Sequence, residues 1–176
     1  FNKGRTDWVL TGYSWLSGIN ASAGELKAQG KTVEPNFVFA NDGHGRFKRI
    51  EDGVFDYVGL CHDAICEDLN NDGLLEIYVA VDDLYGGLFA VTRGGNPLYS
   101  RPDGKNWQNV SEAWGTRHQG NCVAVPAADF DGDGDLDILA VDFYANARLL
   151  RNNTDNDRWI TVKPKGVASN PDGIGA

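Results

Sequence analysis

The stretch Asp129-Phe130-Asp131-Gly132-Asp133-Gly134-Asp135-Leu136-Asp137 alternates carboxylates along a turn that Gly134 allows to be sharp. A second copy, Asp68-Leu69-Asn70-Asn71-Asp72-Gly73-Leu74-Leu75-Glu76, begins 61 residues earlier (129 − 68). Calcium is a hard cation that takes six to eight oxygen ligands at about 2.3–2.6 Å, and alternating carboxylates supply such oxygens. The two stretches therefore predict two calcium-binding loops, and their spacing indicates an internal repeat.

The expected ligands stand at positions 1, 3, 5, 7 and 9 of each loop, where position 7 contributes its backbone carbonyl. They are Asp68, Asn70, Asp72, Leu74 and Glu76 in the first loop, and Asp129, Asp131, Asp133, Asp135 and Asp137 in the second. The second loop offers four side-chain carboxylates and the first offers three plus an amide, so we expect tighter calcium binding in the second. Magnesium fits less well because it demands stricter geometry and keeps its waters. The alternative without a metal is a solvated acidic turn.

The segments that flank the loops distinguish them from EF-hands. An EF-hand loop closes with Glu at position 12 and lies between helices, whereas position 12 of the second loop is Ala140. The runs 77–81 and 138–141 are short and apolar, and 121–126 carries β-branched residues and a proline. Such runs are typical of buried strands. Each loop is therefore expected to join two β-strands.

A hairpin pattern repeats as well. Residues 36–50 align without gaps on 96–110, and both read as an aromatic strand, a Gly/Asp turn and a second strand. A third copy is predicted from Leu149 to Val162. The chain start, residues 4–10, resembles 134–140, which indicates a third loop that lacks its first ligands and for which we expect no metal.

Each repeat thus predicts four strands in about 60 residues, the pattern of one β-propeller blade. The expected fold is all-β, with four-stranded antiparallel blades at about 1–54, 55–115 and 116–158. A closed propeller has four to eight blades. We therefore expect an incomplete propeller or a fragment of a larger one, with open blade edges that partners or other copies cover.

The second loop, followed by Leu149-Leu150-Arg151-Asn152-Asn153, resembles the FG-GAP/VCBS repeat family, the calcium-binding propellers of the cartilage acidic protein type. This resemblance implies calcium-dependent architecture outside the cell, often in adhesion or matrix. The tail, Trp159–Gly166 and Ser169–Ala176, resembles the opening of an ASPIC/UnbV domain. The implied domains are propeller blades over 1–158 and the start of an ASPIC/UnbV-like segment over 159–176.

Composition restricts the partners. The formal net charge of −9 argues against nucleic acid and anionic membranes. No run approaches the roughly 20 apolar residues of a membrane span. Three sequons, at Asn20, Asn109 and Asn152, are modest support for secretion with N-glycosylation. We expect an extracellular protein that meets a matrix or cell-surface protein or glycan.

The three cysteines leave disulfide pairing open. If 61–66 is one extended strand, Cys61 and Cys66 lie about 16 Å apart on opposite faces and cannot bridge each other. Cys61 and Cys122 each precede the first loop aspartate by seven residues, so they hold equivalent places in two repeats. The simplest interpretation makes them small buried apolar groups.

Three functions are compatible with these patterns. The first is a non-enzymatic structural or adhesive calcium module, which also allows self-assembly through open edges. The second is a glycan-binding propeller in which exposed aromatics stack on sugars, with Trp15, Trp107, Trp114 and Tyr144 as candidates. The third is a calcium-dependent polysaccharide lyase, but no nucleophile elbow or zinc helix occurs and the histidines His44, His62 and His118 are scattered. We therefore expect no enzyme and no catalytic residues.

Overall fold

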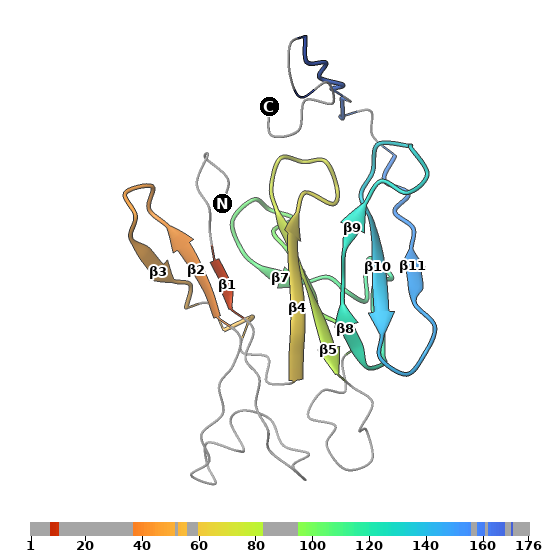
Figure 1. Ribbon diagram of the computed structural model, residues 1–176. Coiled ribbons are helices and arrows are strands. Elements are labelled where there is room, and N and C mark those ends of the chain that lie inside the picture. Colours follow the sequence, from red (N-terminus) through yellow and green to blue (C-terminus); the bar gives the residue numbers. More distant parts are fainter. Residues whose placement is uncertain are drawn as a thin grey trace, which may run out of the picture.

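The computed structural model describes residues 8–10, 37–51, 53–55, 60–82, 95–155, 158–160, 162–167 and 170, without the side chains at 8–10, 37, 60 and 82. This described part contains strands and no helix, and the strands form three antiparallel sheets that stand side by side (Figure 1). No helix there is long and apolar enough to cross a membrane. The predicted all-β fold is confirmed.

Each sheet follows the chain order of its strands almost without crossing. The first sheet contains β1 (Trp8–Leu10), β2 (Phe37–Asn41) and β3 (Phe47–Arg49). The second contains β4 (Leu60–Glu67), β5 (Glu76–Asp82), β6 (Leu98–Ser100) and β7 (Gln108–Asn109). In the third, β10 (Asp137–Asp142) pairs with β8 (Cys122–Ala124), β9 (Ala127–Ala128) and β11 (Arg148–Leu150). Neighbouring strands in one sheet are thus neighbours in sequence, as in a propeller blade.

The register of the hairpins repeats with the sequence. Phe39 lies opposite Arg49 in the first sheet, and Tyr99 lies opposite Asn109 in the second. Each residue of the second pair thus stands 60 positions after its counterpart in the first pair. The strand before each hairpin also repeats its register, because Trp8 faces Phe39 as Ile77 faces Tyr99. The gap-free alignment of 36–50 with 96–110 is confirmed.

The predicted third hairpin is wrong in its second half. β11 forms and pairs with β10, but the described residues of 159–162 lie outside any strand. The Trp159 ring instead lies against Gly134, where a Cβ atom would meet it at 2.1 Å. Packing of this large apolar ring on the loop of its own sheet replaces the edge pairing that the sequence pattern suggests.

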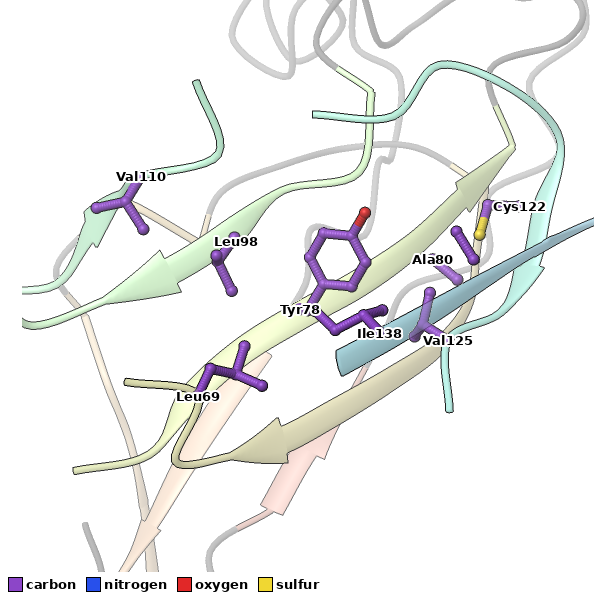
Figure 2. Close-up of a cluster of buried hydrophobic side chains, with 9 residues drawn as sticks. Leu69, Tyr78, Ala80, Leu98, Val110, Cys122, Val125 and Ile138 are labelled. Atoms are coloured by element: carbon purple, nitrogen blue, oxygen red, sulfur yellow. The ribbon is translucent and has the colours of Figure 1, made fainter. Parts of the chain in front are cut away.

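β5 is buried on both faces, as expected for a strand between two other blades. Ile77, Val79 and Val81 pack toward the first sheet, in a cluster with Val38 and Phe55. Its alternate residues, Tyr78 and Ala80, pack toward the third sheet, in the cluster of Figure 2. There the Tyr78 ring lies between Leu98 of its own sheet and Ile138 of the next.

Irregularities occur in the strands that lead into the loops. A bulge between Cys61 and Asp63 shifts the register of β4 by one residue. Cys61 and Cys66 therefore pack into the same apolar cluster, so the expectation of opposite faces is wrong. All three sulfurs are thiols, without a disulfide among the described residues. In the third sheet Pro126 separates β8 from β9, because proline has no N–H to donate to the ladder.

Candidate calcium-binding loops

The two predicted loops lie at the same end of adjacent sheets, between β4 and β5 and between β9 and β10 (Figure 1). Their backbones follow one path. Position 6 has positive φ in both loops, at Gly73 (87°) and Gly134 (92°). Position 4 is also left-handed, at Asn71 (55°) and Gly132 (80°). Glycine and asparagine are the residues that adopt this region at low cost. The sequence prediction assigned a role to position 6 but overlooked position 4.

The first aspartate of each loop binds the turn from inside. The two oxygens of Asp68 accept the backbone N–H groups of Asp72 (3.1 Å) and Gly73 (2.9 Å). Asp129 accepts equivalent bonds from Asp133 (3.1 Å) and Gly134 (3.0 Å). Because these N–H groups point inward, the carboxylates of each loop are held on its concave side.

Three carboxylates converge in the second loop. One oxygen each of Asp129, Asp131 and Asp133 lies within 4.8 Å of the other two, and all three residues are exposed. In the first loop the Asn70 amide donates to the Asp72 carboxylate at 3.0 Å. A hard-oxygen cluster of this kind fits calcium, and it is the donor set that the sequence predicted for positions 1, 3 and 5.

The residue at position 9 of each loop is a buried carboxylate that accepts hydrogen bonds from the protein. Glu76 and Asp137 are almost fully buried. Glu76 accepts the Leu69 N–H (2.9 Å) and the Ser100 hydroxyl (2.9 Å), while Asp137 accepts the N–H groups of Phe130 (3.2 Å) and Asn152 (2.7 Å). In each carboxylate one oxygen thus binds the loop itself, and the other binds a neighbouring segment, at Ser100 in β6 or at Asn152 just after β11. Burial, reinforced by the Asp72 and Asp68 carboxylates, raises the pKa of Glu76 to about 7.

Position 7 has a different role in each loop. Leu74 and Asp135 both donate their N–H to the position 5 aspartate, at 2.7 and 3.0 Å. The Asp135 side chain is buried as well, and it accepts a hydrogen bond from Asn71 of the other loop. Burial and the neighbouring Asp133 carboxylate raise the pKa of Asp135. The sequence required only a backbone carbonyl at this position, so the side-chain contact is new.

Arg151 lies at the mouth of the second loop. Its Nη2 is 2.6 Å from Asp131 Oδ2 and 3.5 Å from Asp133 Oδ2. The cluster therefore already attracts one cationic side chain, which supports its fit to a cation. In the sequence, this arginine stands out only as part of the family-like stretch 149–153. Its charge, 14 residues beyond Asp137, was the signal that went unused.

The predicted sequons differ in accessibility. Asn109 is exposed, and its side-chain oxygen accepts from Ser111. The Nδ2 of Asn152, the atom that a glycan would modify, donates to the carbonyls of Leu69 and Leu136. A glycan on Asn152 is incompatible with this bridge between two blades, so that candidate is disfavoured. Asn20 lies outside the described residues.

The aromatic residues predicted to stack on sugars differ in their exposure to solvent. Trp107 packs edge-to-face on Phe55, with ring centroids 5.2 Å apart, and Arg101 stacks over it at 4.7 Å. Trp107 is therefore a packing residue. Trp114 is 38% exposed and Tyr144 is 73% exposed, so both can meet a ligand. Trp15 lies outside the described residues.

The histidines do not meet at one site in the described structure. His44 is exposed in the β2–β3 turn, and His62 is exposed at the β4 bulge. His118 precedes β8, as predicted, and is buried against Asp142.

Comparison with known proteins gives two results. The chain is 28% identical over 156 residues to a phosphoglucosamine mutase of Ralstonia pickettii (strain 12J), which covers 82% of this chain and 33% of that protein. The chain thus spans about a third of the length of this curated relative. Residues 82–140, which include the second candidate loop, match the FG-GAP-like repeat family. The chain therefore carries an FG-GAP-like repeat at residues 82–140, and its antiparallel sheets are blades of the propeller type that such repeats form.

Proposed function

We propose that this protein is a non-enzymatic, calcium-binding segment of a β-propeller that serves as a structural or adhesive module outside the cell. One observation carries the proposal. Two loops 61 residues apart share one backbone path, and the second brings the carboxylates of Asp129, Asp131 and Asp133 within 4.8 Å of one another. Such a cluster repels itself, and a bound divalent cation removes the repulsion.

Calcium then acts on stability. An ion that binds only the folded loops stabilises the fold by mass action. We expect the melting temperature to rise with calcium concentration and to fall after chelation. The measurement is thermal unfolding by circular dichroism, in EGTA and in millimolar calcium. Unchanged thermal stability after chelation contradicts the proposal.

Calcium alone does not place the protein outside the cell. Expression in a secretory eukaryotic host, followed by enzymatic removal of N-glycans, tests that part of the proposal. We expect a mobility shift that is smaller in Asn109→Gln and unchanged in Asn152→Gln, because Asn109 is exposed and the Nδ2 of Asn152 donates to two backbone carbonyls. Failure of the chain to be secreted in folded form counts against this location.

The far face of the third sheet supports continuation into further blades. Leu139 and Val141 of β10 are only half-buried there, whereas Ile138 and Ala140 are buried against the second sheet. We propose that a further blade covers this face, supplied by a longer chain or a second copy. Mass photometry decides between a second copy and a longer chain as the source of this blade. A dimer supports a second copy, and a monomer supports a longer chain.

Glycan binding is the second candidate, and a specific cleft favours it. The cleft of about 570 Å³ lies between the second and third sheets, and Trp114, Leu149, Arg151, Asn153 and Thr154 line it. An exposed indole beside polar groups suits a sugar ring. We expect glycan-array binding that Trp114→Ala abolishes and Tyr144→Ala leaves intact. An array without signal removes this candidate.

Two finer assignments rest on resemblance. We propose the cartilage acidic protein type and an ASPIC/UnbV-like segment at 159–176 on the sequence of the tail. We do not carry the mutase activity of the relative over to this chain, because the identity is 28% and the chain covers a third of that protein.

A further inference from the structure

A second cluster of metal-ligating side chains lies away from the calcium loops. His118 precedes β8, Cys122 begins β8, and Asp142 ends β10 directly opposite Cys122 in the ladder. One donor atom from each residue lies within 4.8 Å of the other two. Their exposed fractions are 1%, 0% and 8%. Nitrogen, sulfur and oxygen donors thus converge in the interior between the second and third sheets.

The equivalent place in the second sheet shows what is unusual here. Cys61 is 61 residues before Cys122 and is also buried, but its ladder partner is Val81. In the third sheet the same frame places the carboxylate of Asp142 opposite the cysteine. Burial of a carboxylate is costly unless a partner compensates it. In the second sheet the equivalent pair, Cys61 and Val81, packs without any charged group. Packing alone therefore does not explain a carboxylate at Asp142.

His118 pairs with Asp142 through one ring nitrogen only. His118 Nε2 lies 2.9 Å from Asp142 Oδ1 and 3.0 Å from Oδ2. Its other ring nitrogen, Nδ1, is buried and has no hydrogen-bond partner among the described residues. Gly120 leaves the space that brings the pair together, because a Cβ atom there would meet Asp142 Oδ1 at 2.7 Å and His118 Nε2 at 3.0 Å.

The donor chemistry selects the ion. Imidazole and thiolate are ligands for zinc and related transition metals, whereas calcium prefers oxygen. One zinc ion with one thiolate, one carboxylate and a neutral imidazole has no net charge, which makes burial of the group far less costly. Tetrahedral zinc holds its donors about 3.5 Å apart, so the His118–Asp142 hydrogen bond has to open by only a few tenths of an ångström.

We propose that His118, Cys122 and Asp142 form a buried site for one divalent transition metal of the zinc type, which joins β8 and β10 next to the second sheet. Metal binding at His118 Nε2 displaces the thiol proton of Cys122, and the imidazole keeps one proton, on Nδ1, so that it binds the metal as a neutral ligand. The three protein ligands leave a fourth position for a water molecule. The site does not depend on the calcium loops, whose donors are oxygens.

Cobalt titration in excess calcium tests the site, because calcium saturates the oxygen loops and cobalt reports thiolate ligation. We expect a thiolate-to-cobalt charge-transfer band that saturates at one equivalent. Cys122→Ser should abolish the band, and Cys61→Ser, the matched buried cysteine, should preserve it. His118→Gln and Asp142→Asn should each weaken cobalt binding by about 10-fold or more, since loss of an outer-shell partner alone costs that much.

Two further measurements keep the test decisive if Cys122→Ser fails to fold. Gly120→Ala keeps all three ligands but crowds them, so it should lower cobalt affinity in a folded protein. Zinc should raise the melting temperature of the wild type and leave that of Asp142→Asn unchanged. A folded wild type without a charge-transfer band overturns the proposal, as does a band that depends on Cys61 instead of Cys122.

Discussion

Asn71 Nδ2 donates a hydrogen bond of 2.7 Å to Asp135 Oδ1, and this bond links the first calcium loop to the second across 64 residues. The donor stands at the left-handed position 4 of its loop, and the acceptor stands at the buried position 7 of the other. The two loops are therefore one structural unit, and changes in one should reach the other.

Asn71 combines two roles that substitution can separate. Asn71→Gly keeps the positive φ and removes the hydrogen bond, so it should lower the free energy of unfolding by about 1–2 kcal/mol. Asn71→Ala removes the bond and also strains the backbone, which should cost about 1 kcal/mol more. Urea denaturation in calcium measures both. Equal stability of the two variants contradicts the backbone role.

Calcium affinity should differ between the loops. Asp72→Asn and Asp133→Asn change the same position 5, one in each loop, so each variant leaves the other loop to be titrated. We expect the loop that remains in Asp72→Asn to bind calcium more tightly, because its positions 1, 3 and 5 hold three converging carboxylates, whereas the first loop has two carboxylates and an amide there. Isothermal titration calorimetry gives both constants. The reverse order refutes the prediction.

If the second loop binds calcium, as we propose, Arg151 should compete with the ion there. Its guanidinium contacts Asp131 at 2.6 Å, but it is 59% exposed, so solvent screening limits the interaction. Arg151→Ala should tighten calcium binding at that loop by about 2- to 5-fold. Arg148→Ala removes the same charge from a neighbouring exposed site on β11 and serves as the control. If both variants tighten binding equally, the effect comes from net charge and not from the contact.

Glu76 should make the calcium-free protein sensitive to pH. Its pKa is about 7 in the fold, above the ordinary 4.5, so the folded state holds the proton more tightly than the unfolded state. Its contribution to stability is full below pH 4.5 and is lost as pH rises to 7, by about 3 kcal/mol at most. Glu76→Gln should flatten this decline in EGTA. A wild type with constant stability from pH 4.5 to 7 contradicts the prediction.

Gly134 and Gly73 are matched in φ but differ in surroundings. A Cβ atom at Gly134 meets the Trp159 ring at 2.1 Å, whereas one at Gly73 meets nothing within 4 Å. Gly73→Ala should cost about 1 kcal/mol from backbone strain alone. Gly134→Ala should cost more, and the excess should vanish in a Trp159→Ala background. Thermal denaturation of the four variants closes this cycle. An excess that persists without Trp159 rules out the ring contact as its cause.

Local patterns predicted a large part of the fold and of the loops. The carboxylate spacing in 129–137 and the apolar run 77–81 both depend on neighbours in sequence, so a loop between buried strands follows from them directly. The hairpin register of 39–49 and 99–109 was also available, because the two segments align without gaps. These features repeat, and repetition strengthens a weak local signal.

Contacts between blades had no such signal. The Asn71–Asp135 bond, the bridge from Asn152 to Leu69 and the position of Trp159 on Gly134 join residues far apart in the chain. The bulge in β4 inverted the expected faces of Cys61 and Cys66, since one extra residue changes the parity of a strand. The alternation of residues along the sequence does not reveal where such a bulge occurs.

The sequence by itself determined the oxygen-rich loops, the repeat and the blade-like order of strands, because carboxylate spacing, left-handed glycine positions and strand alternation are short-range properties. Only the tertiary structure decided which residues of different blades meet. Packing the second and third sheets together linked the two loops, engaged the Asn152 amide in a hydrogen bond to the other sheet and brought His118, Cys122 and Asp142 to one buried point. The physical reason is that side-chain distances between strands depend on register and on sheet stacking, neither of which a linear pattern contains.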